Sequence, residues 1–61
     1  MTLSFYRFFF RQHDVTVRAE VFECDGDAAA LEKAKALLSS SQHGLIEVWQ
    51  GARKVGIVER G

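Results

Sequence analysis

The chain lacks several features that would define a function class directly. Its 61 residues include no proline and a single cysteine, Cys24, so an internal disulfide is excluded. The longest apolar runs, residues 8–10 and 28–31, are far shorter than the roughly 20 residues that a membrane-spanning helix needs. Basic and acidic residues balance at eight each, so the formal net charge is zero and there is no overall basic footprint for nucleic acid.

Length and composition indicate one small globular domain that spans residues 1–61. A chain of this size buries only about 60% of the surface that its unfolded form exposes, so association with a partner would help to stabilise it. The N-terminal residues do not form a signal peptide, and a lone thiol is typical of a reducing compartment. We therefore expect a cytoplasmic protein that does not insert into a membrane.

The order of local patterns predicts the fold. Strand-favouring residues fill 3–10 and 15–22, which predicts a β-hairpin, and residues 45–49 and 53–59 predict a second one around Gly51. Residues 28–38 are almost all Ala, Leu, Glu and Lys, which predicts a helix with Asp25 or Asp27 as its N-cap. The result is an α+β, two-layer ββαββ sandwich with one helix on one face of a four-stranded antiparallel sheet. The first strand is apolar on both faces, so we expect it to be internal.

Cross-strand pairing predicts which sheet face is buried. We place two-residue turns at Gln12-His13 and Gly51-Ala52, and we expect the helix to pack through a stripe that contains Leu31, Ala34 and Leu38. The sheet residues expected on this buried face are Tyr6, Phe8, Phe10, Val15, Val17, Ala19, Ile46, Val48, Val55 and Ile57. A three- or five-residue loop in the first hairpin would exchange the faces of one strand relative to the other.

The opposite face is unusually apolar for a sheet with one solvated side. Its large apolar residues are Leu3, Phe5, Phe9, Phe22, Leu45, Trp49 and Val58. A patch of this kind usually marks an interaction site, and most soluble oligomers are two-fold homodimers. We therefore expect a non-enzymatic interaction module that forms a homodimer, or binds another protein partner, through this face or through a strand edge.

Two other functions stay open. The same face is expected to carry Arg7, Arg11, Arg18 and Lys54 between its aromatic residues, a pattern that is typical of single-stranded nucleic-acid binding. Glu20 and Glu47 are expected there too, and together with the zero net charge they argue against such binding. The third function is binding of a small ligand in a cavity at a dimer interface.

Candidate residues for catalysis are few. Cys24 with His13 or His43 would be the only nucleophile and base, but acidic neighbours of Cys24 work against a lowered thiol pKa. No spacing typical of a zinc site accompanies these residues. We expect no catalytic, cofactor-binding or metal-binding residues, and we expect that the protein is not an enzyme.

Three segments carry a resemblance to a known group of proteins. They are YRFFF at residues 6–10, CDGDAAA at 24–30 and EVWQGAR at 47–53. With them the chain resembles small single-domain proteins of alphaproteobacteria, a family without an established activity. The resemblance implies a bacterial cytoplasmic protein and no particular site residues. More loosely, the chain resembles antitoxin-type domains of toxin–antitoxin pairs, but it lacks their separate DNA-binding helix or ribbon.

Overall fold

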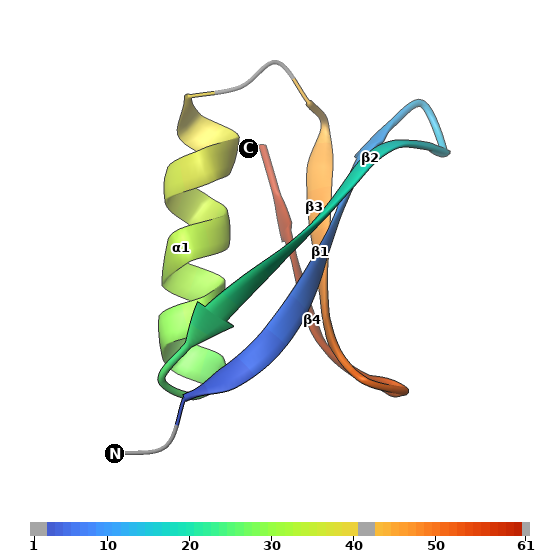
Figure 1. The fold of residues 1–61 in the computed structure, drawn as a ribbon. Coiled ribbons are helices and arrows are strands. Elements are labelled where there is room, and N and C mark those ends of the chain that lie inside the picture. The colour runs from blue at the N-terminus through green and yellow to red at the C-terminus, as the bar shows by residue number, and fades with distance from the viewer. Residues whose placement is uncertain (1–2, 41–42, 61) are drawn as a thin grey trace.

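The four strands and the helix follow the expected order. A computed structural model describes residues 3–40 and 43–60. It contains β1 (Ser4–Gln12), β2 (Val15–Cys24), α1 (Asp27–Ser39), β3 (Leu45–Gln50) and β4 (Arg53–Glu59). The strands form one antiparallel sheet in the order β2-β1-β3-β4, so β1 is internal as expected, and β2 and β4 are the edges. The fold is α+β, with α1 on one side of the sheet (Figure 1).

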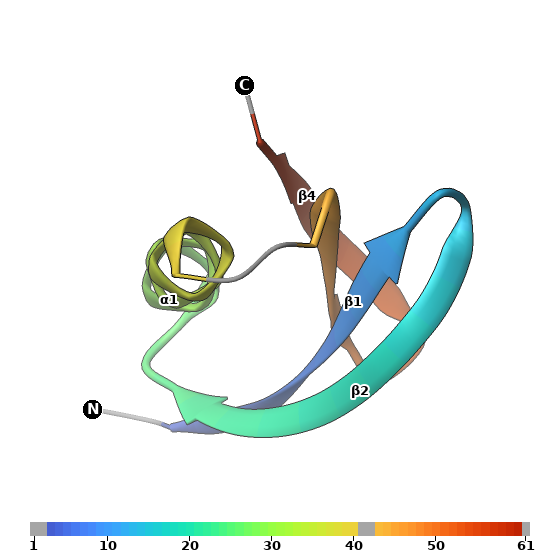
Figure 2. The ribbon, with the colours of Figure 1, turned by 90° about the horizontal axis from the view of Figure 1, so that it is seen from above.

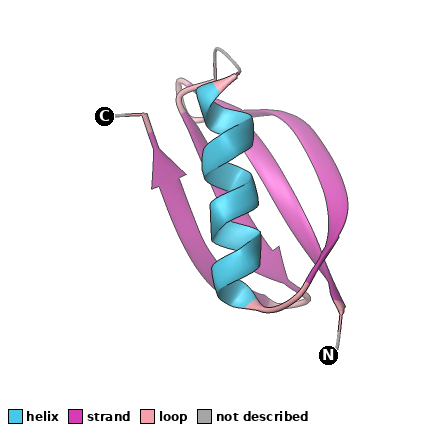
Figure 3. Cartoon of the chain, turned by 90° about the vertical axis from the view of Figure 1, so that its left-hand side faces the viewer, coloured by secondary structure: helices cyan, strands magenta, loops and turns pink. Residues whose placement is uncertain are grey.

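The core lies between α1 and the two internal strands. Every second side chain of β1 from Tyr6 to Phe10 is buried, and β3 adds Ile46 and Val48. The helix contributes the expected stripe, in which small alanines allow a close approach to the sheet. Its buried residues are Ala30, Ala34 and Leu38, with Leu31 and Leu37 partly buried. Viewed along the helix, the sheet curves around α1 (Figure 2). From the side of the helix, α1 lies over one face of the sheet (Figure 3).

The helix begins without the expected carboxylate cap. Its N-cap is Gly26, at φ 98°, and no side chain accepts a capping hydrogen bond there. The predicted N-cap role of Asp25 or Asp27 is therefore wrong. Asp27 is the first helical residue, where its negative charge still favours the positive end of the helix dipole. Within the described residues no helix combines the length and apolarity needed to cross a membrane.

The first hairpin differs from the expected register in two ways. Its turn lies at His13 and Asp14, which have φ values of 53° and 64°, one residue later than predicted. In addition, the register shifts between Phe10 and Arg11, because β2 carries one extra residue opposite them. Such a β-bulge reverses which side chains of the strand face the core. Ala19, beyond the bulge, therefore stands opposite Phe9 and faces away from the core, and Val17 is the extra residue itself. Val15 lies before the bulge, opposite Gln12, and is exposed near the tip of the hairpin. The predicted place of all three residues in the core is wrong.

The second hairpin has the predicted turn and an unpredicted bulge. Gly51 takes φ 60°, and Gln50 stands opposite Arg53 as expected. A register shift follows between Val48 and Trp49, so that Ile46 faces Val58 instead of Ile57. Val58 is therefore buried and Ile57 is 40% exposed, the reverse of the prediction.

The position of Gly56 gives a physical reason for this second bulge. The shift places Gly56 opposite Val48, on the face that packs against the helix. A Cβ atom at Gly56 would lie 3.2 Å from Cδ2 of Leu31, which is tighter than ordinary van der Waals contact. The residue without a side chain thus lies where Leu31 leaves little room for one, and Val58 takes a neighbouring core position.

The close helix–sheet contact predicts the outcome of a matched pair of substitutions. Ala34→Leu places a larger side chain at a fully buried contact, and we expect it to lower the free energy of unfolding by about 1–3 kcal/mol or more. Ala36→Leu, on the exposed side of the same helix, should change it by less than about 0.5 kcal/mol. Urea unfolding monitored by circular dichroism measures both. Equal effects would contradict the close packing.

Candidate interaction surface

The sheet face turned away from α1, here called the outer face, follows from the strand registers. Its residues are Phe5, Arg7, Phe9, Arg11, Thr16, Ala19, Val21, Glu23, Leu45, Glu47, Trp49, Lys54, Ile57 and Glu59. Of the residues predicted to form an apolar interface, Phe9, Leu45 and Trp49 lie on this face and are partly buried. Leu3 and Phe5 are exposed, and Phe5 is 69% exposed.

Two residues of the predicted interface lie on the other side of the sheet. Phe22 stands opposite Tyr6 and packs against the core, with its ring centroid 4.8 Å from that of Phe8 and Lys33 Nζ 4.8 Å above it. Val58 is part of the core. Both placements correct the prediction, and both result from the β-bulges, which reverse the alternation of β2 and β4.

The centre of the outer face is a polar network rather than an open apolar surface. The largely buried carboxylate of Glu47 accepts hydrogen bonds from Arg11 Nη1 at 2.6 Å and from Trp49 Nε1 at 3.1 Å. These hydrogen bonds, that of Trp49 first, lower the pKa of Glu47, and the nearby charge of Lys54 acts in the same direction. Glu47 thereby holds the indole in place and offsets the positive charge around it.

The basic residues expected to contact nucleic acid are only partly gathered. Arg7 and Lys54 lie on the outer face, on opposite sides of Trp49, and Arg11 is held by Glu47. Arg18 is not on this face. It stands opposite Phe10 and forms an ion pair with Glu20 at 2.6 Å, and Glu20 itself stands opposite Phe8. The predicted placement of Arg18 and Glu20 on the outer face is therefore wrong.

Exposed apolar side chains concentrate on the first hairpin. Among the described residues, six large hydrophobic side chains are exposed, and all but Ile57 belong to β1, β2 or the residue just before β1. We call these five the hairpin patch: Leu3, Phe5, Val15, Val17 and Val21. Phe5 and Val21, with Arg7 and Gly51, also line a surface hollow of about 330 Å³.

Three members of the hairpin patch, Val15, Val17 and Val21, lie on an unpaired edge strand. β2 is the last strand of the sheet, ten residues long, and its outward side pairs with no strand in the part of the chain that the structure describes. The tip of the hairpin extends well away from α1 (Figure 1). Sequence reasoning placed Val17 in the core and made no assignment for Val21, because a one-residue bulge leaves no signature in an alternating pattern.

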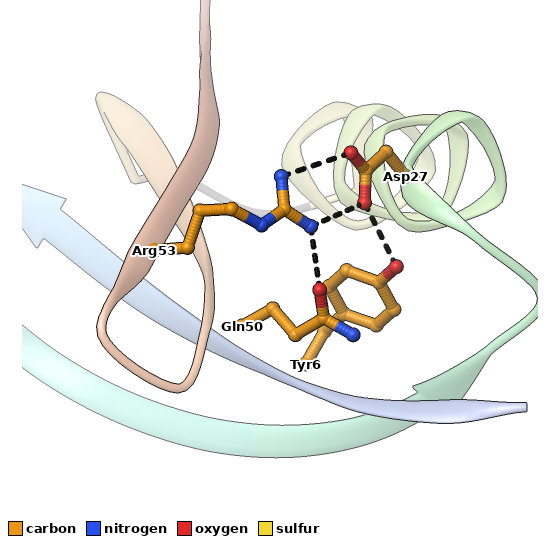
Figure 4. A network of polar contacts seen from close by, with 4 residues as sticks. All are labelled: Tyr6, Asp27, Gln50 and Arg53. Atoms are coloured by element: carbon orange, nitrogen blue, oxygen red, sulfur yellow. Dashed lines mark hydrogen bonds and ion pairs between the residues drawn. The ribbon is translucent and has the colours of Figure 1, made fainter.

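A second polar network ties the start of the helix to the sheet (Figure 4). The hydroxyl of buried Tyr6 donates to Asp27 Oδ1 at 2.9 Å, and Arg53 donates to both carboxylate oxygens of Asp27, at 3.0 and 3.1 Å. Gln50 accepts a further hydrogen bond from Arg53. The network joins β1, α1 and β4, and its carboxylate is occupied by these donors. It therefore ties the start of the helix to the sheet.

The network shifts the pKa values of its members. Hydrogen bonds from Arg53 and then from Tyr6 hold the pKa of Asp27 below its usual range, and Asp27 in turn raises the pKa of Arg53. Burial, followed by the hydrogen bond to Asp27, raises the pKa of Tyr6. All three residues thus keep their ordinary protonation states at neutral pH.

The candidate nucleophile and bases lie at different places in the fold. Cys24 is buried at the end of β2 that adjoins the helix, and burial raises the pKa of its thiol. His13 lies in the exposed turn at the other end of β2, and the His43 ring packs edge-on against Phe10 at 5.2 Å. Across residues 3–40 and 43–60, no three His, Cys, Asp or Glu side chains gather closely enough to hold a metal ion.

The lowered pKa of Asp27 predicts the direction of a pH effect. Because folding lowers this pKa, the network stabilises the fold above the unfolded pKa of about 3.9, and this contribution is lost as pH falls through the folded value. Asp27→Asn should reduce the melting temperature at pH 7. Between pH 5 and about pH 2, the melting temperature of this variant should then fall by less than that of the wild type. A residual decrease from Glu47 should persist in the variant.

Thermal unfolding at a series of pH values measures this difference. Asp25→Asn, an exposed neighbour outside the network, is the matched control and should follow the wild type. If Asp27→Asn and the wild type lose stability in parallel on acidification, Asp27 does not have the assigned role.

Comparison with known proteins adds no further constraint. No family model matches the chain, and neither a curated protein nor a solved structure matches it significantly. Its function must therefore be argued from its own residues, above all from the hairpin patch and the β2 edge.

Proposed function

We propose that this chain is a non-enzymatic interaction module that self-associates through its first hairpin. The observation that carries the proposal is the concentration of exposed large apolar side chains on the hairpin, beside the unpaired edge of β2. Phe5 and Val21, the largest contributions from the outer face, are 69% and 53% exposed. A long edge strand with apolar neighbours is a template for pairing with another strand.

A second copy of the chain is a partner of the right kind. A typical stable interface buries about 800 Å² on each partner. The chain exposes 4102 Å², so such an interface would cover roughly a fifth of its surface. Covering the edge would protect it from uncontrolled aggregation and would add buried apolar area to a domain with a small core.

Binding of single-stranded nucleic acid has weaker support. Such binding needs aromatic faces beside uncommitted positive charge. On the outer face, however, Trp49 and Arg11 are both held by Glu47, and Arg18 lies on the opposite face. This function remains an alternative outcome of the experiment that follows.

Light scattering after size exclusion, over a wide dilution series, tests the proposal. We expect a dimer for the wild type. Val21→Lys should shift it toward monomer, because an added charge at the patch must lose its hydration when the interface forms. Ile57→Lys is the matched control, since Ile57 is an exposed β-branched residue of the same face on the opposite edge strand, and this variant should remain dimeric.

Two results would overturn the proposal. One is a wild-type monomer at every concentration, and the other is an equal loss of association in Val21→Lys and Ile57→Lys. Binding of a labelled oligonucleotide by the monomer, weakening steeply with added salt, would instead favour the nucleic-acid alternative.

A further inference from the structure

The middle of β2 has a sequence that is complementary to itself. Residues 17–21 read VRAEV. In the reverse direction the order of residue types is the same, except that the positive Arg18 and the negative Glu20 change places. Ala19 is the centre of this symmetry. The segment lies within the exposed edge strand, where no other described strand covers it.

Antiparallel pairing of two such edges brings complementary residues together. A two-fold axis through Ala19 places Arg18 opposite Glu20 of the partner subunit and Val17 opposite Val21 of the partner subunit. Ala19 then faces Ala19 of the partner subunit. Directly opposed residues of antiparallel strands interact, favourably for opposite charges and unfavourably for like charges.

The charges select this register over its neighbours. A two-fold axis perpendicular to the sheet keeps each face of one sheet continuous with the same face of the other, so the register can change only in steps of two residues. A step in one direction sets Arg18 against Arg18 of the partner subunit. A step in the other direction sets Glu20 against Glu20 of the partner subunit. Only the register centred on Ala19 pairs both charges with opposite ones.

The side chains involved are accessible and already correctly placed. Arg18 and Glu20 project from the same face of β2 and form an ion pair within the strand at 2.6 Å. Their side chains are 63% and 34% exposed, so each can reach a second opposite charge. Across the axis the four charged groups would alternate in sign.

We infer that two copies of the chain join along β2 in antiparallel register centred on Ala19, forming one continuous eight-stranded sheet. The inference rests on the proposed self-association and names the strand, the register and the pairs that specify it. The two-fold axis leaves both helices on one face of the joined sheet and both outer faces on the other. In the joined sheet, each end of the paired segment holds one copy of Val17, the residue at the bulge.

Charge exchange tests the register. Arg18→Glu sets the new carboxylate opposite Glu20 of the partner subunit at two symmetric positions, and Glu20→Arg places like positive charges there. Each variant alone should weaken the dimer by about tenfold or more. Mixing the two variants should restore association as a heterodimer, and the double variant Arg18→Glu/Glu20→Arg should form a homodimer again.

Native mass spectrometry and light scattering distinguish the outcomes, with circular dichroism to confirm that each variant is folded. A wild-type dimer whose single variants associate as tightly as the wild type would overturn this register and leave the proposed self-association standing. The same conclusion follows if the single variants are weakened but neither the mixture nor the double variant recovers. A wild-type monomer at all concentrations would overturn both proposals.

Cross-linking provides an independent measurement at the axis. Directly opposed Cα atoms in an antiparallel pair lie about 4.5–5.5 Å apart, which is within disulfide range. Ala19→Cys should therefore give a covalent dimer on mild oxidation. Val21→Cys is the control, because in this register its two copies are separated by about 13 Å along the strands. The native Cys24 is buried, and oxidation of the wild type measures any cross-linking that Cys24 gives by itself. Equal cross-linking of both variants would overturn the proposed centre.

Discussion

Two β-bulges decide how this small sheet divides its side chains between the core and the surface. Each adds one residue to an edge strand, and in a structure with a repeat of two residues a single insertion reverses every side chain beyond it. The bulge in β2 turns Phe22 inward and Val21 outward, and the bulge in β4 does the same for Val58 and Ile57. The core, the outer face and the exposed edge all depend on these two insertions.

The helix explains why the insertion in β4 is tolerated. Its small buried residues Ala30 and Ala34 allow α1 to lie close to the sheet, and Leu31 occupies the space above Gly56 that a side chain would need. Asp27 then ties the beginning of the helix to Tyr6 and Arg53 (Figure 4). A single helix of thirteen residues leaves the far end of the first hairpin uncovered (Figure 1), and there Val15 and Val17 remain exposed.

This distribution moves the candidate interface from the middle of the outer face to its margin. At the centre, Glu47 binds Arg11 and Trp49, so these two side chains are already held within the chain. The hairpin patch provides exposed apolar surface. The neighbouring β2 edge provides backbone groups that pair with no strand in the described part of the chain. An interface at that position would extend the sheet rather than stack two sheets face to face, which makes strand register the main determinant of specificity.

Local sequence determined the elements and their order: the Ala-rich helix with its stripe, the turn at Gly51, and an internal first strand that is apolar on both faces. It also placed Phe5 and Leu3 on the surface, and it contains the self-complementary segment of residues 17–21. Only the tertiary structure decided the faces of β2 and β4, and with them the places of Phe22, Val58, Val21 and Arg18. The physical reason is that the alternation of apolar and polar residues shows which residues share a strand face, but it does not show where a bulge adds an extra residue. The position of that residue depends on packing against the helix.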